Sequence, residues 1–110
     1  MIFSQGDIIK LNFDPALGHE HSGYRPAIVI SRKMFQEKTG HVIVCPITKK
    51  SRPYPTWIFI GNQTETEGFI ICEHIKTIDV NARKPIFVER ISEHVLDKVL
   101  AIVHSEIEKE

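Results

Sequence analysis

Two polar segments beside predicted strands carry side chains suited to chemistry on a phosphate diester. The first runs from Glu20 to Pro26 and contains Arg25. Proline restricts the residue before it to extended backbone, so Pro26 is expected to place Arg25 at the junction between a loop and a strand. The planar guanidinium offers five donors that match a phosphate. Glu20 is close enough in sequence to act as a base or to form a structural salt bridge with Arg25, and the spacing leaves both open.

The second segment follows a strand that we expect to end at Thr48. The Thr48 hydroxyl can donate to a phosphoryl oxygen, and Tyr54 offers a ring on which an unpaired base can stack. Local positive charge comes from the residues next along the chain, Lys49, Lys50 and Arg52. A solvated basic loop explains the same residues without any ligand. Trp57 belongs to the following strand, and we expect it in the core or in a dimer contact rather than stacked on a base.

Imidazole and carboxylate groups occur near both segments. His19 and His21 flank Glu20, but this spacing alone is a weak metal signal and no further ligand follows at a convincing distance, so we expect no metal. Glu73, His74 and Lys76 close the fifth predicted strand, where they either reach the same rim or simply face solvent. Candidates for a proton-transfer group are therefore Glu20, Glu73 and His19, and the sequence does not choose among them.

The composition limits the classes of protein to which such a site can belong. The chain has 110 residues, 42% hydrophobic and 25% charged, with 14 basic and 14 acidic residues, which predicts one globular domain over 1–110. Zero net charge argues against a general nucleic-acid coating protein, so any nucleic acid must bind a local patch. No apolar run approaches the ~20 residues of a membrane helix, and the N-terminal residues lack the pattern of a signal peptide. We expect a cytoplasmic protein that does not bind membranes.

The elements that must position these residues are mostly strands. Apolar runs bounded by turn residues predict strands at 7–13, 27–30, 41–45, 56–60, 68–72 continuing to 75, and 85–88. From Ser92 onward, apolar residues recur at spacings of three and four, which predicts an amphipathic helix capped by Ser92. Cys45 and Cys72 lie inside apolar runs and are expected to be buried free thiols. The pattern predicts a small barrel or twisted sheet of five to seven strands with a packed C-terminal helix.

The sequence resembles the MazF/PemK toxins, the toxin halves of bacterial toxin–antitoxin pairs. The matching motifs are Gly6-Asp7, Leu11-x-Phe13-Asp14-Pro15, Gly18-His-Glu20-His-Ser-Gly23-Tyr-Arg25-Pro26, Val44-Cys-Pro46-Ile-Thr48 and Glu73-His-Ile-Lys76-Thr77-Ile78-Asp79-x-x-Ala82-Arg83, followed by the terminal helix. They cover nearly the whole chain in the right order.

The resemblance implies a mainly β, SH3-like or CcdB-like barrel that forms homodimers. It also implies a cofactor-free, metal-independent endoribonuclease that cuts single-stranded RNA by attack of a 2′-hydroxyl, leaving 2′,3′-cyclic phosphate and 5′-hydroxyl ends. Arg25 and Thr48 match the family's main catalytic positions, Glu20 a neighbouring acidic residue, and His19 a histidine of the PemK-like branch. We expect RNA contacts from the nearby basic and aromatic residues, namely Lys49, Lys50, Arg52, Tyr54, Lys76 and Arg83.

The resemblance also predicts which molecules bind this protein. The resemblance implies a MazE-type antitoxin with an acidic, hydrophobic tail, and binding of operator DNA only by the toxin–antitoxin complex.

The sequence departs from the PemK-like branch in the fifth strand. That branch carries Arg-x-Asp there, whereas here the strand reads Ile71-x-Glu73, which makes Arg25 the stronger candidate for the catalytic role. A different class of function on the same barrel is a CcdB-like, gyrase-directed binding toxin or an inactive relative; the pair Arg25 and Thr48 argues against it.

Overall fold

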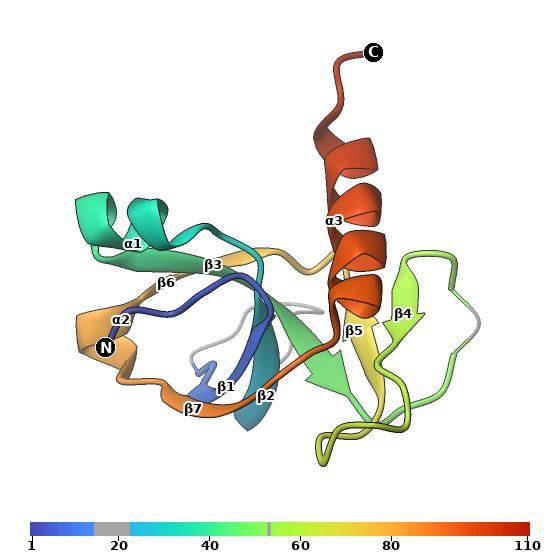
Figure 1. The fold of residues 1–110 in the computed structure, drawn as a ribbon, viewed down its shortest axis with the longest axis horizontal. Coiled ribbons are helices and arrows are strands. Elements are labelled where there is room, and N and C mark those ends of the chain that lie inside the picture. The colour runs from blue at the N-terminus through green and yellow to red at the C-terminus, as the bar shows by residue number, and fades with distance from the viewer. Residues whose placement is uncertain (15–22, 53) are drawn as a thin grey trace.

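The computed structural model of the chain describes residues 1–14, 23–52 and 54–110. Within these residues, antiparallel strands form one sheet and three helices pack around it (Figure 1). The elements are β1 (Asp7–Asn12), β2 (Tyr24–Val29), α1 (Lys33–Thr39), β3 (His41–Thr48), β4 (Trp57–Phe59), β5 (Phe69–Ile71), β6 (Lys76–Asp79), α2 (Val80–Arg83), β7 (Ile86–Arg90) and α3 (Glu93–Ile107). The strand order is β4-β5-β3-β2-β1-β7, with β6 also paired to β3.

The strands β1, β2 and β3 are buried on both faces because the sheet curls around two apolar clusters. Ile8 and Ile28 face the cluster that α3 covers, whereas the next residues, Ile9 and Val29, face a second cluster with Phe3. Ile9, Leu11 and Phe13 share this second cluster, as their alternation predicts. Burial on both faces explains why these strands read as continuous apolar runs.

The segment after Gly68 differs from the predicted single strand to Ile75. It forms two strands, β5 and β6, which pair in line with the same strand β3: Phe69 with Thr48 and Lys76 with Val44. Between them the chain turns, and the amide of His74 donates to the carbonyl of Ile71 at 3.2 Å. The apolar run does not reveal this break, because the turn uses no glycine or proline.

The C-terminal helix is confirmed, including its start. The Ser92 hydroxyl accepts a hydrogen bond from the Val95 amide at 3.3 Å, and Leu96, Val99 and Val103 are buried against the strands. Figure 1 shows α3 standing beside β4 and β5 at one side of the sheet. No helix in the described ranges is long and apolar enough to cross a membrane.

The short helices α1 and α2 were not predicted, since seven and four residues are too few for a clear helical period. The helix α1 ends at Gly40 with φ 76°, and its buried Gln36 side chain accepts from the Phe3 amide and donates to the Met1 carbonyl. Both cysteines are free and buried, as predicted. Burial raises the pKa of the Cys72 thiol to about 12, so it stays protonated near neutral pH.

Candidate active site

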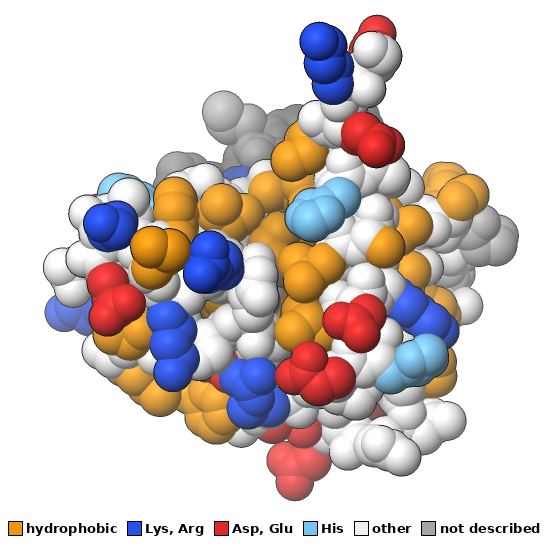
Figure 2. Space-filling view, turned by 45° about the horizontal axis from the view of Figure 1, so that its top comes forward, with side chains coloured by type: hydrophobic (Ala, Val, Ile, Leu, Met, Phe, Trp, Pro, Cys, Tyr) orange, Lys and Arg blue, Asp and Glu red, His pale blue; other side chains and the backbone are white. Residues whose placement is uncertain are grey.

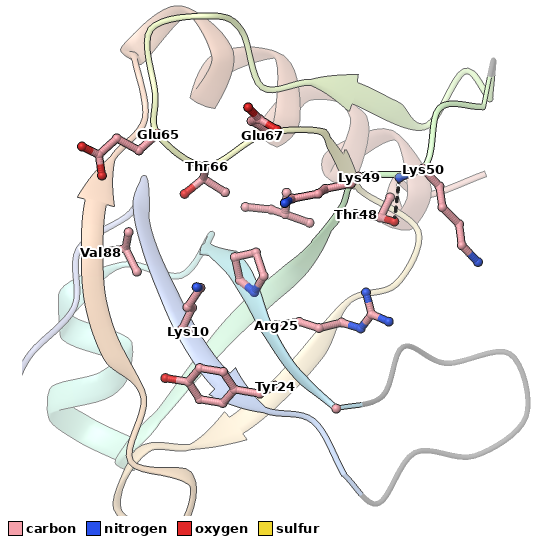
Figure 3. A pocket seen from close by; sticks show the side chains of 13 residues that line it. Lys10, Tyr24, Arg25, Thr48, Lys49, Lys50, Glu65, Thr66, Glu67 and Val88 are labelled. Atoms are coloured by element: carbon pink, nitrogen blue, oxygen red, sulfur yellow. Dashed lines mark hydrogen bonds between the residues drawn. The ribbon is translucent and has the colours of Figure 1, made fainter.

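An open pocket of about 850 Å³ lies over β2, between the end of β3 and the strands β1 and β7 (Figure 3). The loop that joins β4 to β5, residues 61–68, forms its far wall. Its lining residues are Lys10, Gly23, Tyr24, Arg25, Pro26, Ile47, Thr48, Lys49, Lys50, Glu65, Thr66, Glu67 and Val88. The pocket therefore brings together Arg25 and Thr48, which lie on different strands, and the two lysines that follow Thr48.

Arg25 reaches the pocket from within β2 rather than from a loop-to-strand junction. The strand begins at Tyr24, and Arg25 pairs with Leu11 of β1, while Pro26 pairs with Lys10. The predicted strand at 27–30 therefore begins three residues too late, because the pairing with β1 extends back through Pro26 to Tyr24. Arg25 is half-buried on a paired strand, so the backbone from which its guanidinium extends is held in place.

Thr48 ends β3 and is only 3% exposed. Its hydroxyl oxygen accepts a hydrogen bond from the Lys50 amide at 3.2 Å, drawn as the dashed line in Figure 3, which turns the chain out of the strand. With its oxygen so engaged, the hydroxyl can donate its proton to a ligand oxygen in the pocket. The backbone of Gly68 packs directly on the Thr48 carbonyl, where an added Cβ would lie 2.0 Å from the oxygen. Gly68 is therefore required for the approach of the loop to β3.

The two sides of the pocket carry opposite charge. Arg25, Lys49 and Lys50 form what we call the cationic side, and Figure 3 shows Thr48 among them. The loop opposite contributes two exposed carboxylates, Glu65 and Glu67. With Lys10 on β1, four cations line the pocket against two carboxylates, so the pocket attracts an anion such as a phosphate diester although the chain as a whole is neutral.

Glu73 lies in a separate cluster and is not among the described residues that line the pocket. Its carboxylate accepts hydrogen bonds from the Thr56 hydroxyl at 2.6 Å and from the indole nitrogen of Trp57 at 3.0 Å. Partial burial works against ionisation, but these hydrogen bonds outweigh it and hold the pKa of Glu73 below its usual range. The Trp57 ring also meets Tyr54 edge-on at 5.4 Å. Glu73 thus orders the outer surface of β4.

The remaining predicted site residues are spread over the surface. Lys76 lies on β6 and is not among the described lining residues of the pocket. Arg83 ends α2, and its guanidinium donates to the carbonyls of Asn12 and Asp14, so it holds the end of β1. Arg52 and Tyr54 are exposed beyond Lys50 on the segment that leads to β4. His19 and Glu20 lie outside the described residues.

Sequence reasoning missed several residues of the pocket. Lys10 reads as an exposed position of an alternating strand, and nothing in the sequence links it to Arg25. Glu65, Thr66 and Glu67 belong to a segment that composition marks only as a loop. The one available signal was Gly68, since a glycine that opens an apolar run often marks a close approach of two backbones. No group of three or more His, Cys, Asp or Glu side chains able to hold a metal gathers within 1–14, 23–52 and 54–110.

The fold and pocket define a small barrel-like β domain with a cationic cleft at the end of its central strand. The fold matches that of MazF from Deinococcus radiodurans with a TM-score of 0.92, at 27% identity and 99% coverage of both chains. A MazE–MazF complex from the same organism matches with a TM-score of 0.88, at 24% identity and full coverage of both chains.

Residues 4–106 match the family model of the PemK-like, MazF-like toxins of type II toxin–antitoxin systems, and the chain belongs to this family. A related protein is the endoribonuclease toxin MazF of Escherichia coli K12, which is 38% identical over 78 residues, or 71% of this chain and 69% of that protein. The expected family and barrel-like fold are thereby confirmed.

Proposed function

We propose that this toxin is a sequence-specific endoribonuclease that cuts single-stranded RNA in the pocket over β2 and so stops translation. The observation that carries the proposal is the meeting of Arg25 and Thr48 beside Lys49 and Lys50 in one open pocket. Support comes from the relative in Escherichia coli, which is an endoribonuclease toxin. No feature of the pocket favours the alternative of a gyrase-directed binding toxin.

The proposed reaction needs no group beyond the protein and the RNA. The ribose 2′-oxygen loses its proton to a base of the protein and bonds to the adjacent phosphorus. The bond from phosphorus to the 5′-oxygen breaks, and that oxygen takes a proton from the protein, so that no proton is gained or lost overall. The products are a 2′,3′-cyclic phosphate and a 5′-hydroxyl end. Arg25 neutralises charge that builds on the phosphorane oxygens, and Thr48 donates a hydrogen bond to one of them. A single preorganised donor of this kind contributes about 10²–10³ in rate.

The base is one of three groups. Glu73 is engaged by Thr56 and Trp57, and its lowered pKa makes it a weak base. Glu20 and His19, which precede Arg25 in the chain, are the candidates that remain once Glu73 is set aside. We assign the role to Glu20, with His19 as the alternative.

The proposed partners follow from the charge of the pocket and from an exposed apolar surface. An antitoxin of the MazE type with an acidic tail would cover the cationic side, and the MazE–MazF structure from Deinococcus radiodurans supports such an assembly. Figure 2 shows hydrophobic side chains in a column along α3, where Ile107 is 74% exposed, and we assign this surface to a second copy of the chain. Operator DNA is bound only by the toxin–antitoxin complex, in the cytoplasm where the mRNA is translated.

The test is a digest of a long mixed-sequence RNA in EDTA, with every new 5′ end mapped. We expect cuts at one short motif with 5′-hydroxyl ends. Arg25→Ala should lose at least about 10²-fold in kcat/KM while remaining folded. Arg25→Lys should also fail, because a point charge does not replace a fork of donors. Cuts that persist unchanged in both variants, or an absence of cuts from the folded wild-type protein, would contradict the proposal.

A further inference from the structure

One side chain holds the far wall of the pocket in place. The carboxylate of Glu89 on β7 accepts three hydrogen bonds from the loop 61–68. One oxygen accepts from the Glu65 amide at 3.1 Å, and the other accepts from both the amide and the hydroxyl of Thr66 at 2.8 Å each. Partial burial opposes ionisation of Glu89, but these donors outweigh it and lower the pKa of the carboxyl. Glu89 is therefore ionised near neutral pH, the state in which it accepts most strongly.

The same loop is fixed at its two ends. The carbonyl of Gly68 accepts from the Ile60 amide at 2.9 Å, and Gly68 packs on the backbone of Thr48. Within the loop, the Thr64 hydroxyl donates to the Thr66 carbonyl at 2.7 Å. With its two ends joined to each other, one of them packed on β3, and its middle held by Glu89, the loop has a set shape rather than that of a free connection.

This shape places a carboxylate on the wall opposite Arg25, where it disfavours a phosphate. Glu65 and Glu67 flank Thr66 on this wall. Figure 3 shows Glu67 on the side nearer Lys49, whereas the Glu65 carboxylate points away from Arg25. An RNA phosphate near this wall would meet like charge, so the backbone of a bound strand belongs along Arg25 and Lys49. A carboxylate accepts hydrogen bonds but donates none, and the groups of a nucleotide that suit it are the amino and imino donors on base edges.

We infer that Glu89 is a positioning residue for substrate choice: it holds loop 61–68 so that Glu67 accepts hydrogen bonds from the amino-bearing edge of one RNA base while the cationic side holds the neighbouring phosphate. The inference rests on the proposed ribonuclease function and adds to it the part of the chain that selects a base. Glu89 itself touches no substrate and acts through the loop.

The experiment maps cleavage sites on a long mixed-sequence RNA and measures kcat and KM on a short oligonucleotide that carries the preferred site. The variants are Glu89→Ala, Glu89→Gln, Thr66→Val and Glu67→Gln. The control is Glu37→Gln, which changes an exposed carboxylate on α1 away from the pocket. Circular dichroism and a urea titration establish that each variant is folded.

We expect Glu89→Ala to raise KM about tenfold with kcat within about threefold, and to relax the preference at one nucleotide of the site. Glu67→Gln should change the preference at that same nucleotide. Glu89→Gln keeps one acceptor oxygen and Thr66→Val removes one donor. Both variants should raise KM and relax the nucleotide preference by smaller factors than Glu89→Ala. Glu37→Gln should match the wild type.

Two results separate the inference from the proposed function. If the wild type cuts RNA and the folded Glu89 and Thr66 variants cut the same motif with unchanged KM, the inference is overturned while the ribonuclease proposal stands. A lower unfolding midpoint alone, with site preference and KM intact, would likewise reduce Glu89 to a structural role. A folded wild-type protein that cuts no RNA overturns both. If Glu89→Ala does not fold, Glu89→Gln and Thr66→Val decide.

Discussion

The close approach of Gly68 to Thr48 makes a prediction that the neighbouring glycine Gly61 can calibrate. Both residues have positive φ, +120° and +101°, so an alanine at either position carries a backbone penalty of about 1–3 kcal/mol. At Gly61 nothing lies within 4 Å of the added methyl group, whereas at Gly68 it would lie 2.0 Å from the Thr48 carbonyl oxygen and 2.7 Å from its carbon. Gly61→Ala therefore isolates the backbone penalty, and Gly68→Ala adds the collision.

The free-energy cost of the collision follows from the two backbone segments that must move apart. A methyl carbon needs more than 3 Å from a carbonyl oxygen, so the backbones of β3 and the loop must separate by about 1 Å. This separation weakens the pairing of Thr48 with Phe69 and the hydrogen bond from the Ile60 amide to the Gly68 carbonyl. Two such bonds at about 0.5–1.5 kcal/mol each give an excess destabilisation of about 2 kcal/mol over Gly61→Ala.

The assay is urea unfolding at one fixed protein concentration, because self-association would otherwise shift the midpoint. With a slope of about 1–3 kcal/mol per molar urea, the excess corresponds to a midpoint about 1 M lower for Gly68→Ala than for Gly61→Ala. RNA cleavage by the folded fraction is the second readout, since a displacement of about 1 Å at Thr48 can cost about 10²-fold in rate. Equal midpoints and equal rates for the two variants would refute the close approach.

Three further predictions concern single side chains. Thr48→Val, which keeps the shape but removes the hydroxyl, should lower kcat about 10²-fold; a change confined to KM would limit Thr48 to binding. The contribution of Glu73 to stability should be present above its unfolded-state pKa of about 4.3 and lost as the pH falls through its lower folded-state pKa. The fluorescence of Trp57, the single tryptophan, should report that transition, and Glu73→Gln should abolish it. Glu20→Gln should lower kcat by about 10²–10⁴-fold and remove the acidic limb of the pH–rate profile; a limb that responds to His19→Gln instead assigns the base to the imidazole.

The parts of the fold that were predictable are those with a strong period or a local signal. The apolar runs of β1, β2 and β3 and the spacing along α3 locate the core, and Ser92 marks the start of the helix in sequence and in structure. The break between β5 and β6 was not predictable, because it depends on how both strands pair with β3 rather than on turn residues.

The candidate site was predictable only in part, for the same reason. Arg25 and Thr48 stand out by residue type and by neighbours in sequence, and the structure brings them into one pocket. The far wall depends on contacts between distant residues: Glu89 is 23 positions from Thr66, and no local pattern links them. Gly68 carries a visible glycine signal, but its partner Thr48 becomes evident only once β3 and β5 are paired.

The adjacency of the first and last strands has a consequence for the synthesis of a protein that is proposed to destroy messages. Asp7 of β1 pairs with Arg90 of β7, so the sheet is complete only when the last strand joins the first. A ribosome adding roughly 5–20 residues per second delivers Thr48 roughly 2 to 8 seconds before Glu89. During that interval the growing chain has its cationic residues but lacks the strand that anchors the opposite wall. We therefore expect the nascent chain to be inactive, so that a toxin still attached to its own message does not cut it.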